Sequence, residues 1–164
     1  KITLDGVDIR DISIETLRSQ IGYVPQTGIL FSGDINSNIS YGAPGIDEAG
    51  IKEAAQIAQA TEFIEDKPDK FESAIAQGGT NVSGGQKQRV AIASSVLAEK
   101  EILIFDEPTS GLDYYHMVST AQLFKELRDM GKSIFIITHD RELIERCCNY
   151  EFYVADRQAT LYGL

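Results

Sequence analysis

The strongest hydrophobic pattern in the chain is a pair of short apolar runs in its last third. Residues 102–105 read Ile-Leu-Ile-Phe and residues 134–137 read Ile-Phe-Ile-Ile, with no polar residue inside either run. Uninterrupted runs of this length are typical of parallel strands that are buried on both faces. The pattern therefore predicts two buried strands, over residues 102–105 and 133–138.

The remaining pattern predicts helices and shorter strands around these two runs. Apolar residues at helical spacing predict helices over residues 47–58, 61–69, 86–97, 117–130 and 141–148. Strands are predicted over residues 2–4 and 21–24, and a closing pair of strands over 151–154 and 160–162. Residues 76–85 are rich in Gly, Thr, Asn and Ser, so a loop is predicted there.

The order of these elements predicts the fold class. Strands and helices alternate in the last third, which indicates right-handed crossovers and a mainly parallel sheet. The predicted fold is therefore α/β, with a helical subdomain inserted into one sheet core. We divide the chain into a core segment (residues 1–31), the helical subdomain (32–90) and a second core segment (91–164).

Composition and charge exclude several classes of function. The 164 residues are 43% hydrophobic and 24% charged, which is ordinary for a globular domain, and the net charge is -10. An acidic chain argues against nucleic acid as a partner, because phosphate backbones are bound by clustered Lys and Arg. No apolar run is long enough to cross a bilayer. The adjacent Cys147 and Cys148 are a poor disulfide pair, and no charged-then-apolar leader opens the chain, so we expect a reducing, cytosolic compartment.

Two carboxylates follow the first apolar run. Asp106 and Glu107 stand at the carboxyl end of a predicted buried strand, which is where open α/β sheets bind ligands. Asp106 suits Mg²⁺ held through water, and Glu107 suits the polarisation of an attacking water. Taken alone, the pattern fits a strand that ends in two solvated acids equally well.

A histidine follows the second run, in Thr138-His139-Asp140. A lone His at a strand end is more often structural than catalytic. Parallel neighbouring strands end at the same edge of a sheet, so His139 gains weight from Asp106 and Glu107. The three side chains together predict a site for a phosphate-bearing ligand.

A third candidate site is Ser83-Gly84-Gly85-Gln86, at the start of a predicted helix. Ser83 is a good N-cap, and the two glycines let a ligand approach the backbone. The positive end of the helix then favours an anion. The alternative is a Gly-rich loop with an ordinary cap, which the Gln-Lys-Gln-Arg sequence from Gln86 onward disfavours.

In order and spacing, these motifs resemble the ATP-binding cassette (ABC) ATPase family over nearly the whole chain. Residues 82–86 match the signature motif, residues 102–106 match Walker B, and Glu107 matches the catalytic glutamate. Residues 110–113, ending in Asp113, match the D-loop, and His139 matches the switch histidine. Tyr23-Val24-Pro25-Gln26 matches the Q-loop, in which Gln26 senses Mg²⁺.

The resemblance implies a RecA-like P-loop NTPase core that binds ATP and Mg²⁺ and hydrolyses ATP. It implies that Glu107 is the base or water orienter, that Asp106 and Gln26 hold Mg²⁺, and that His139 contacts the γ-phosphate. Two such domains pair head to tail, so Ser83, Gly84, Gly85, Gln86 and Asp113 are expected at the partner's nucleotide. Transmembrane domains are then driven from the cytoplasmic face of the plasma membrane.

The sequence departs from the family pattern in two respects. It contains no G-x-x-x-x-G-K-[ST] phosphate loop (Walker A), so we expect a truncated domain whose own ATP binding is weak. It is also a mosaic, which resembles multidrug-type exporters over residues 26–42 and 77–81 and importer or energy-coupling-factor ATPases over residues 93–95 and 105–117. A natural fragment, a chimera and a divergent member all fit, and the direction of transport stays open.

Two alternatives to a transport ATPase follow from these departures. The first is a non-hydrolysing fragment or interaction module that offers its signature surface to a complete partner. The second is an ABC ATPase without a membrane partner, as in DNA repair or translation. The second class usually has long coiled-coil insertions or tandem domains, and neither is present in this sequence.

Overall fold

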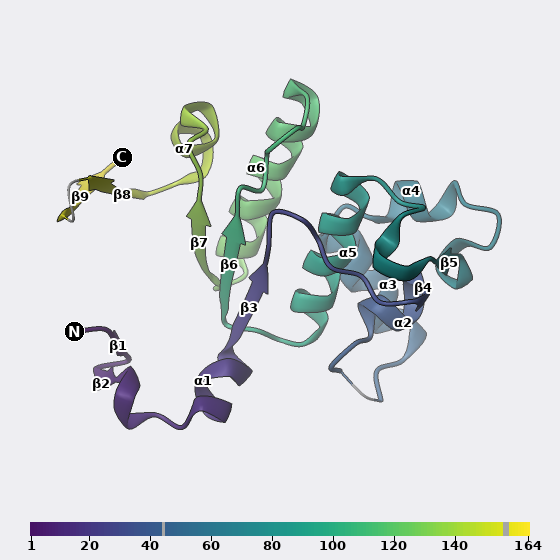
Figure 1. Ribbon diagram of the computed structural model, residues 1–164, viewed down its shortest axis with the longest axis horizontal. Helices are drawn as coiled ribbons and strands as arrows, with labels where there is room; N and C mark the ends of the chain where they lie inside the picture. Colours follow the sequence, from purple (N-terminus) through teal and green to yellow (C-terminus); the bar gives the residue numbers. More distant parts are fainter. Residues whose placement is uncertain (44, 156–157) are drawn as a thin grey trace.

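A three-stranded parallel sheet organises the molecule (Figure 1). The computed structural model describes residues 1–43, 45–155 and 158–164. The sheet has the order β3-β6-β7, formed by β3 (Ile21–Val24), β6 (Ile102–Asp106) and β7 (Ser133–Ile137). Its register pairs Val24 with Phe105 and Asp106 with Ile137, so all three strands end at one edge. The α/β class and the parallel sheet are thereby confirmed.

Six helical segments and one short ladder separate β3 from β6. They are α2 (Ile35–Ile39), α3 (Glu48–Ile57), α4 (Thr61–Glu65), η2 (Lys70–Glu72), η3 (Gln77–Gly79), α5 (Gly84–Leu97) and the pair β4 (Gly33–Asp34) and β5 (Ala74–Ile75). Figure 1 shows this helical part beside the sheet, as the predicted insertion requires. The exact division at residues 31 and 90 stays a prediction.

The other elements lie around the sheet. Before β3 the chain forms β1 (Thr3–Leu4), β2 (Val7–Asp8), η1 (Ile9–Asp11) and α1 (Ile14–Gln20). After β6 come α6 (Tyr114–Asp129), α7 (Arg141–Cys147) and the antiparallel hairpin of β8 (Tyr150–Ala155) and β9 (Gln158–Gly163). None of the helices described is both long and apolar enough to cross a bilayer.

Helix α5 joins the helical part to the sheet. It packs against α2 and α3 and also against β3. Gly22 of β3 permits the second contact, because a Cβ at that position would lie 2.8 Å from Leu103 Cδ2 and 3.2 Å from Ser95 Cβ. The close approach of α5 to the sheet therefore requires a glycine.

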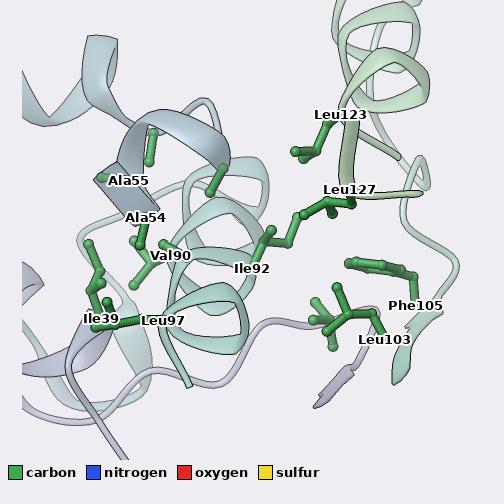
Figure 2. Packing of buried hydrophobic residues seen from close by; sticks show 14 of the residues in the cluster. Ile39, Ala54, Ala55, Val90, Ile92, Leu97, Leu103, Phe105, Leu123 and Leu127 are labelled. Carbon is green, nitrogen blue, oxygen red and sulfur yellow. The ribbon is translucent and has the colours of Figure 1, made fainter. Parts of the chain in front are cut away.

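One hydrophobic core runs through both parts of the molecule (Figure 2). Leu103 and Phe105 of β6 point toward α5 and α6, and the rings of Phe105 and Phe124 are 4.5 Å apart. Ile92 on α5 lies between these residues and the helical part, where Ala54, Ala55 and Ile39 continue the cluster. The insertion is thus packed onto the sheet and shares its core.

The prediction that residues 102–105 and 133–138 are buried on both faces is wrong. Leu103 and Phe105 are fully buried, but Phe135 and Ile137 of β7 are 53% and 54% exposed. Helix α5 packs against β3 and α6 packs against β7, and Phe135 and Ile137 are not covered by this packing. A hollow of about 660 Å³ lies between β7 and the β8–β9 hairpin. Apolar runs alone do not distinguish one covered face from two.

Several predicted boundaries are corrected by capping residues. The predicted loop 76–85 contains η3, and α5 begins at Gly84, because Ser83 caps it. Asp113 caps α6 at Tyr114, three residues before the predicted start. The helix predicted over residues 61–69 ends at Glu65. Helix α1 was not predicted, although Ser13 caps it.

Candidate functional site

The carboxyl edge of the sheet gathers the predicted catalytic residues. The β6–β7 ladder continues one residue beyond β6, because the Glu107 N–H donates to the Ile137 carbonyl over 2.8 Å. This hydrogen bond places Glu107 beside the loop of residues 138–140. The parallel register therefore brings together two motifs that lie 32 residues apart.

Glu107 and His139 are in direct contact. His139 Nδ1 lies 2.9 Å from Glu107 Oε1. The hydrogen bond to this carboxylate and its negative charge raise the pKa of His139. The His139 side chain is 86% exposed and that of Glu107 is 23% exposed, so the pair is open to a ligand from the histidine side.

Glu107 also has an unusual backbone conformation. Its φ is +46°, in the left-handed region that non-glycine residues rarely adopt. The hydrogen bond to Ile137 and the turn bond from the Ser110 N–H to the Glu107 carbonyl, 3.1 Å, hold it there. Such conformations cost about 1–3 kcal/mol and persist where the surrounding structure imposes them.

The two predicted Mg²⁺ ligands lie at the same edge. Asp106 ends β6, and Gln26 follows β3, its neighbour in the sheet. Gln26 Nε2 donates to Ser110 Oγ over 3.1 Å, and the Tyr23 hydroxyl donates to Asp106 Oδ2 over 2.9 Å. The described residues include no group of three or more His, Cys, Asp or Glu that could hold a metal. One carboxylate and one amide fit Mg²⁺, which keeps several waters and takes few protein ligands.

Sequence reasoning assigned no role to Thr109, Ser110, Asp140 or the Tyr23 side chain at this edge. Thr109 Oγ1 donates to Asp140 Oδ2 over 2.9 Å, linking the turn after β6 to the loop after β7. Asp140 directly follows His139 in the sequence Thr138-His139-Asp140. The signal available from sequence was therefore adjacency to predicted site residues at the ends of neighbouring strands.

The predicted anion site is the N-terminus of α5. Ser83 Oγ accepts from the Gln86 N–H over 3.2 Å, and Gln86 Oε1 accepts from the Ser83 N–H over 3.1 Å. The Gln86 side chain thus completes a capping box. A Cβ at Gly84 would meet nothing within 4 Å, so the backbone of this turn is open to a ligand.

Asp113 is the N-cap of α6 and follows Leu112, which faces the start of α5. Its Oδ1 accepts from the His116 N–H over 2.9 Å and lies 2.8 Å from His116 Nδ1. The hydrogen bonds from His116 lower the pKa of Asp113. Leu112 faces Gly85, where a Cβ would lie 3.6 Å from Leu112 Cδ2. The structure therefore gathers the site residues into two groups, one at the sheet edge and one at the starts of α5 and α6.

Known proteins are similar to this chain in sequence and in fold. The family model described as "ABC transporter" matches residues 1–110. An ATP-dependent lipid A-core flippase of Desulfotalea psychrophila is 44% identical over 140 residues, which are 84% of this chain and 24% of the flippase. A multidrug efflux ATP-binding/permease protein of Mycobacterium bovis is 41% identical over 160 residues, which are 98% of this chain and 13% of that protein.

A solved structure is also similar to this chain in fold and in sequence. The structure of a bacterial Atm1-family ABC exporter with ATP bound matches with a TM-score of 0.84 and 30% sequence identity. The match covers 94% of this chain and 27% of the exporter. This chain thus spans about a quarter of the exporter and of the flippase. Since the family model covers more than half of the 164 residues, the chain belongs to the ABC transporter family.

Proposed function

We propose that this chain forms part of an ATP-hydrolysing domain that couples ATP hydrolysis to transport across a membrane. The contact between Glu107 Oε1 and His139 Nδ1, 2.9 Å at the carboxyl edge of the sheet, carries the proposal. It pairs a proton acceptor with a proton donor where an α/β sheet binds its ligand. Membership in the ABC family supports ATP as that ligand.

The two residues have complementary roles in this reaction. The Glu107 carboxylate orients the attacking water and accepts its proton. The neighbouring carboxylate raises the pKa of His139, so the protonated ring is favoured. The ring donates from Nδ1 to Glu107 and offers its Nε2 proton to the γ-phosphate, where charge develops in the transition state.

Asp106 and Gln26 complete the sheet-edge site. We propose that Asp106, through water, and the Oε1 atom of Gln26 hold Mg²⁺. When it is bound, Mg²⁺ neutralises negative charge on the phosphate oxygens. The bond from Tyr23 to Asp106 Oδ2 orients that carboxylate, and the bond to Ser110 orients the Gln26 amide.

The second group of residues suits a nucleotide held by another domain. We propose a head-to-tail dimer in which Ser83, Gly84, Gly85, Gln86 and Asp113 face the partner's ATP. The first N–H groups of a helix lack partners within that helix and attract anions. Relatives named as a flippase and an efflux permease support transmembrane domains as further partners, with this domain at the cytoplasmic face of the plasma membrane.

The proposal can be tested with two histidine variants of the natural gene product that contains these residues. His139→Ala should lower ATP turnover by about 10²-fold or more, because the proton donor is lost. His116→Ala is the matched control, since this exposed histidine also lies beside a carboxylate, 2.8 Å from Asp113 Oδ1. Equal turnover in the two variants would remove His139 from the mechanism.

The interaction-module alternative predicts a different outcome. Under it, neither histidine variant changes turnover at a complete partner domain, whereas Ser83→Arg abolishes it. The open backbone at Gly84 favours a ligand-facing surface under both proposals. Variants of Glu107 and His139 therefore distinguish hydrolysis by this chain from a role in which it only supports hydrolysis by a partner domain.

A further inference from the structure

The Asp140 carboxylate connects three segments near the sheet edge. Its Oδ2 accepts from Thr109 Oγ1 over 2.9 Å, from the turn after β6. Its Oδ1 accepts from the N–H groups of Glu142 and Leu143, over 3.1 and 3.2 Å, at the start of α7. One side chain therefore ties the turn after β6, the loop after β7 and helix α7 together.

The Thr109 end of this tie is well shielded. Thr109 is 7% exposed, and the preceding Pro108 is fully buried. Leu112 N–H donates to the Thr109 carbonyl over 3.0 Å, which fixes the backbone of the turn. A shielded hydroxyl with a charged acceptor makes a stronger hydrogen bond than one in water.

His139, in contrast, has little to hold it in place. Its side chain is 86% exposed, and among the described residues its side-chain hydrogen bond is with Glu107. Both neighbours of His139 are anchored, however, because the Asp140 N–H donates to Thr138 Oγ1 over 3.1 Å and Asp140 binds Thr109. The path of the loop, and not the packing of the ring, therefore directs His139 toward Glu107.

The two side-chain contacts close a small ring of residues. Glu107 and Thr109 stand two residues apart on one side, and His139 and Asp140 are adjacent on the other. Breaking either contact removes one of the two ties across this ring. The contacts should therefore be coupled, as neighbours within one hydrogen-bond network usually are.

We propose that Thr109 and Asp140 are positioning residues that hold the loop of residues 138–140 so that His139 stays against Glu107. The hydroxyl of Thr109 acts through Asp140 and touches neither ATP nor the attacking water. The effect on the position of His139 involves residues of this chain and needs neither ATP nor a partner domain. Its importance for turnover rests on the function proposed above.

The simpler alternative is that Asp140 only caps α7. In that case Thr109 merely satisfies the second carboxylate oxygen, and losing its hydroxyl lowers stability without moving His139. Asp140→Asn cannot separate the two ideas, because the negative charge of Asp140 itself raises the pKa of His139. Thr109→Val can, since it removes a hydroxyl and changes no charge.

The test is the pKa of each histidine, followed by NMR of the ring carbons in the 164-residue chain. In Thr109→Val the pKa of His139 should fall toward its ordinary value, because contact with Glu107 becomes less frequent. Thr109→Ser keeps the hydroxyl and should restore the raised pKa. Thr120→Val is the matched control, because it removes another buried hydroxyl, bonded to the His116 carbonyl over 2.9 Å.

An unchanged His139 pKa in a folded Thr109→Val chain would overturn the proposal. If the valine variant does not fold, Thr109→Ala removes the same hydroxyl without an added methyl group and is read in the same way. Turnover of the natural gene product supplies a second readout, and a small misplacement of a catalytic group costs up to about 10²-fold. A shifted pKa without any ATP turnover in the wild type would uphold the positioning and reject the proposed function.

Discussion

The sheet edge and the start of α5 are organised in opposite ways. At the sheet edge, side chains from different strands contact one another, as Glu107 does His139 and Thr109 does Asp140. At the start of α5, the side chains of Ser83 and Gln86 each accept from the backbone N–H of the other residue, within one turn. The contacts of the first region join separate segments of this chain, whereas the backbone of the second region is open above Gly84.

This difference indicates how the two regions work. A site that must move protons benefits from groups fixed in advance, because no reorganisation is then needed during the reaction. A surface that must meet a partner's ligand needs open backbone and a rigid support. The capping box supplies the support, and the missing side chain at Gly84 supplies the opening. This difference fits the proposal that the sheet edge carries the chemistry and that the start of α5 meets a partner's nucleotide.

The largest expected effect would follow from disabling the sheet edge. Glu107→Gln retains the shape of the side chain but removes the proton acceptor. Turnover of the natural gene product should fall by about 10²–10⁴-fold. ATP binding, measured by titration calorimetry, should persist. A loss smaller than about tenfold would give Glu107 a structural role and break the assignment of chemistry to this region.

The next effect concerns the start of α5. A chain carrying Ser83→Arg is mixed with a partner that has an intact phosphate loop and a disabled signature. The partner's ATP then faces the arginine, so hydrolysis at that site should be lost although the partner's catalytic residues are unchanged. Ser83→Ala is the control, since it removes the cap at a cost of about 1 kcal/mol and adds no bulk.

Full hydrolysis at the partner's site in the Ser83→Arg complex would reject the head-to-tail arrangement. Ser83 would then act only as the cap of its own helix. The two regions would no longer differ in the way proposed, because neither would serve a second domain.

The sequence predicted some residues and contacts of each region and missed others. The two apolar runs and the polar residues that follow them predicted Asp106, Glu107 and His139 at one sheet edge, and the parallel register confirms that placement. No role was predicted for Thr109 or Asp140, because their hydrogen bond depends on how a turn and a loop approach each other in three dimensions. At α5, Ser83 before the predicted helix was enough to predict the cap, because an N-cap is a local interaction, whereas the bond from the Gln86 side chain that completes the capping box was not predicted.

Burial was predicted less well than position. The apolar run of β7 suggested two covered faces, yet Phe135 and Ile137 are more than half exposed. A run of apolar residues records hydrophobicity and says nothing about which elements pack on each face. The roles of the site residues, in contrast, depend on local chemistry, and they stay predictions until the variants are measured.

A smaller effect is expected at Gln59, which connects α5 with α6. Ser119 on α6 donates to the Gln59 side chain, and Gln59 Nε2 donates to the Ser119 carbonyl over 3.3 Å. Arg89 on α5 donates to the Gln59 carbonyl. Ser119→Ala should lower the free energy of unfolding by about 0.5–1.5 kcal/mol, the usual contribution of a side-chain hydrogen bond.

Urea denaturation of the 164-residue chain measures this loss, with Ser94→Ala as the control. Ser94 is also on a helix, so both variants gain the same helix propensity, but its bond to the Tyr41 carbonyl is exposed and 3.3 Å long. Equal stability of the two variants would show that the Ser119 bond to Gln59 does not stabilise the packing of α5 beside α6.

The smallest expected effect is the pH dependence of stability that arises from His139 at the sheet edge. Glu107 raises the pKa of His139 above its ordinary value of 6.5. A group whose pKa is raised on folding contributes stability below its unfolded pKa and loses that contribution as the pH rises through its folded pKa. The wild-type chain should therefore exceed Glu107→Gln in stability below pH 6.5. The difference should shrink as the pH rises through the folded pKa of His139.

Chemical denaturation at a series of pH values, with NMR titration of the His139 ring, checks this expectation. Glu107→Gln should lower the pKa of His139, because it removes the carboxylate that His139 contacts. An unchanged His139 pKa in Glu107→Gln would show that this contact does not set the charge state of His139. The sheet edge would then no longer hold a protonated ring beside the proposed proton acceptor, and the contrast with the start of α5 would lose its electrostatic part.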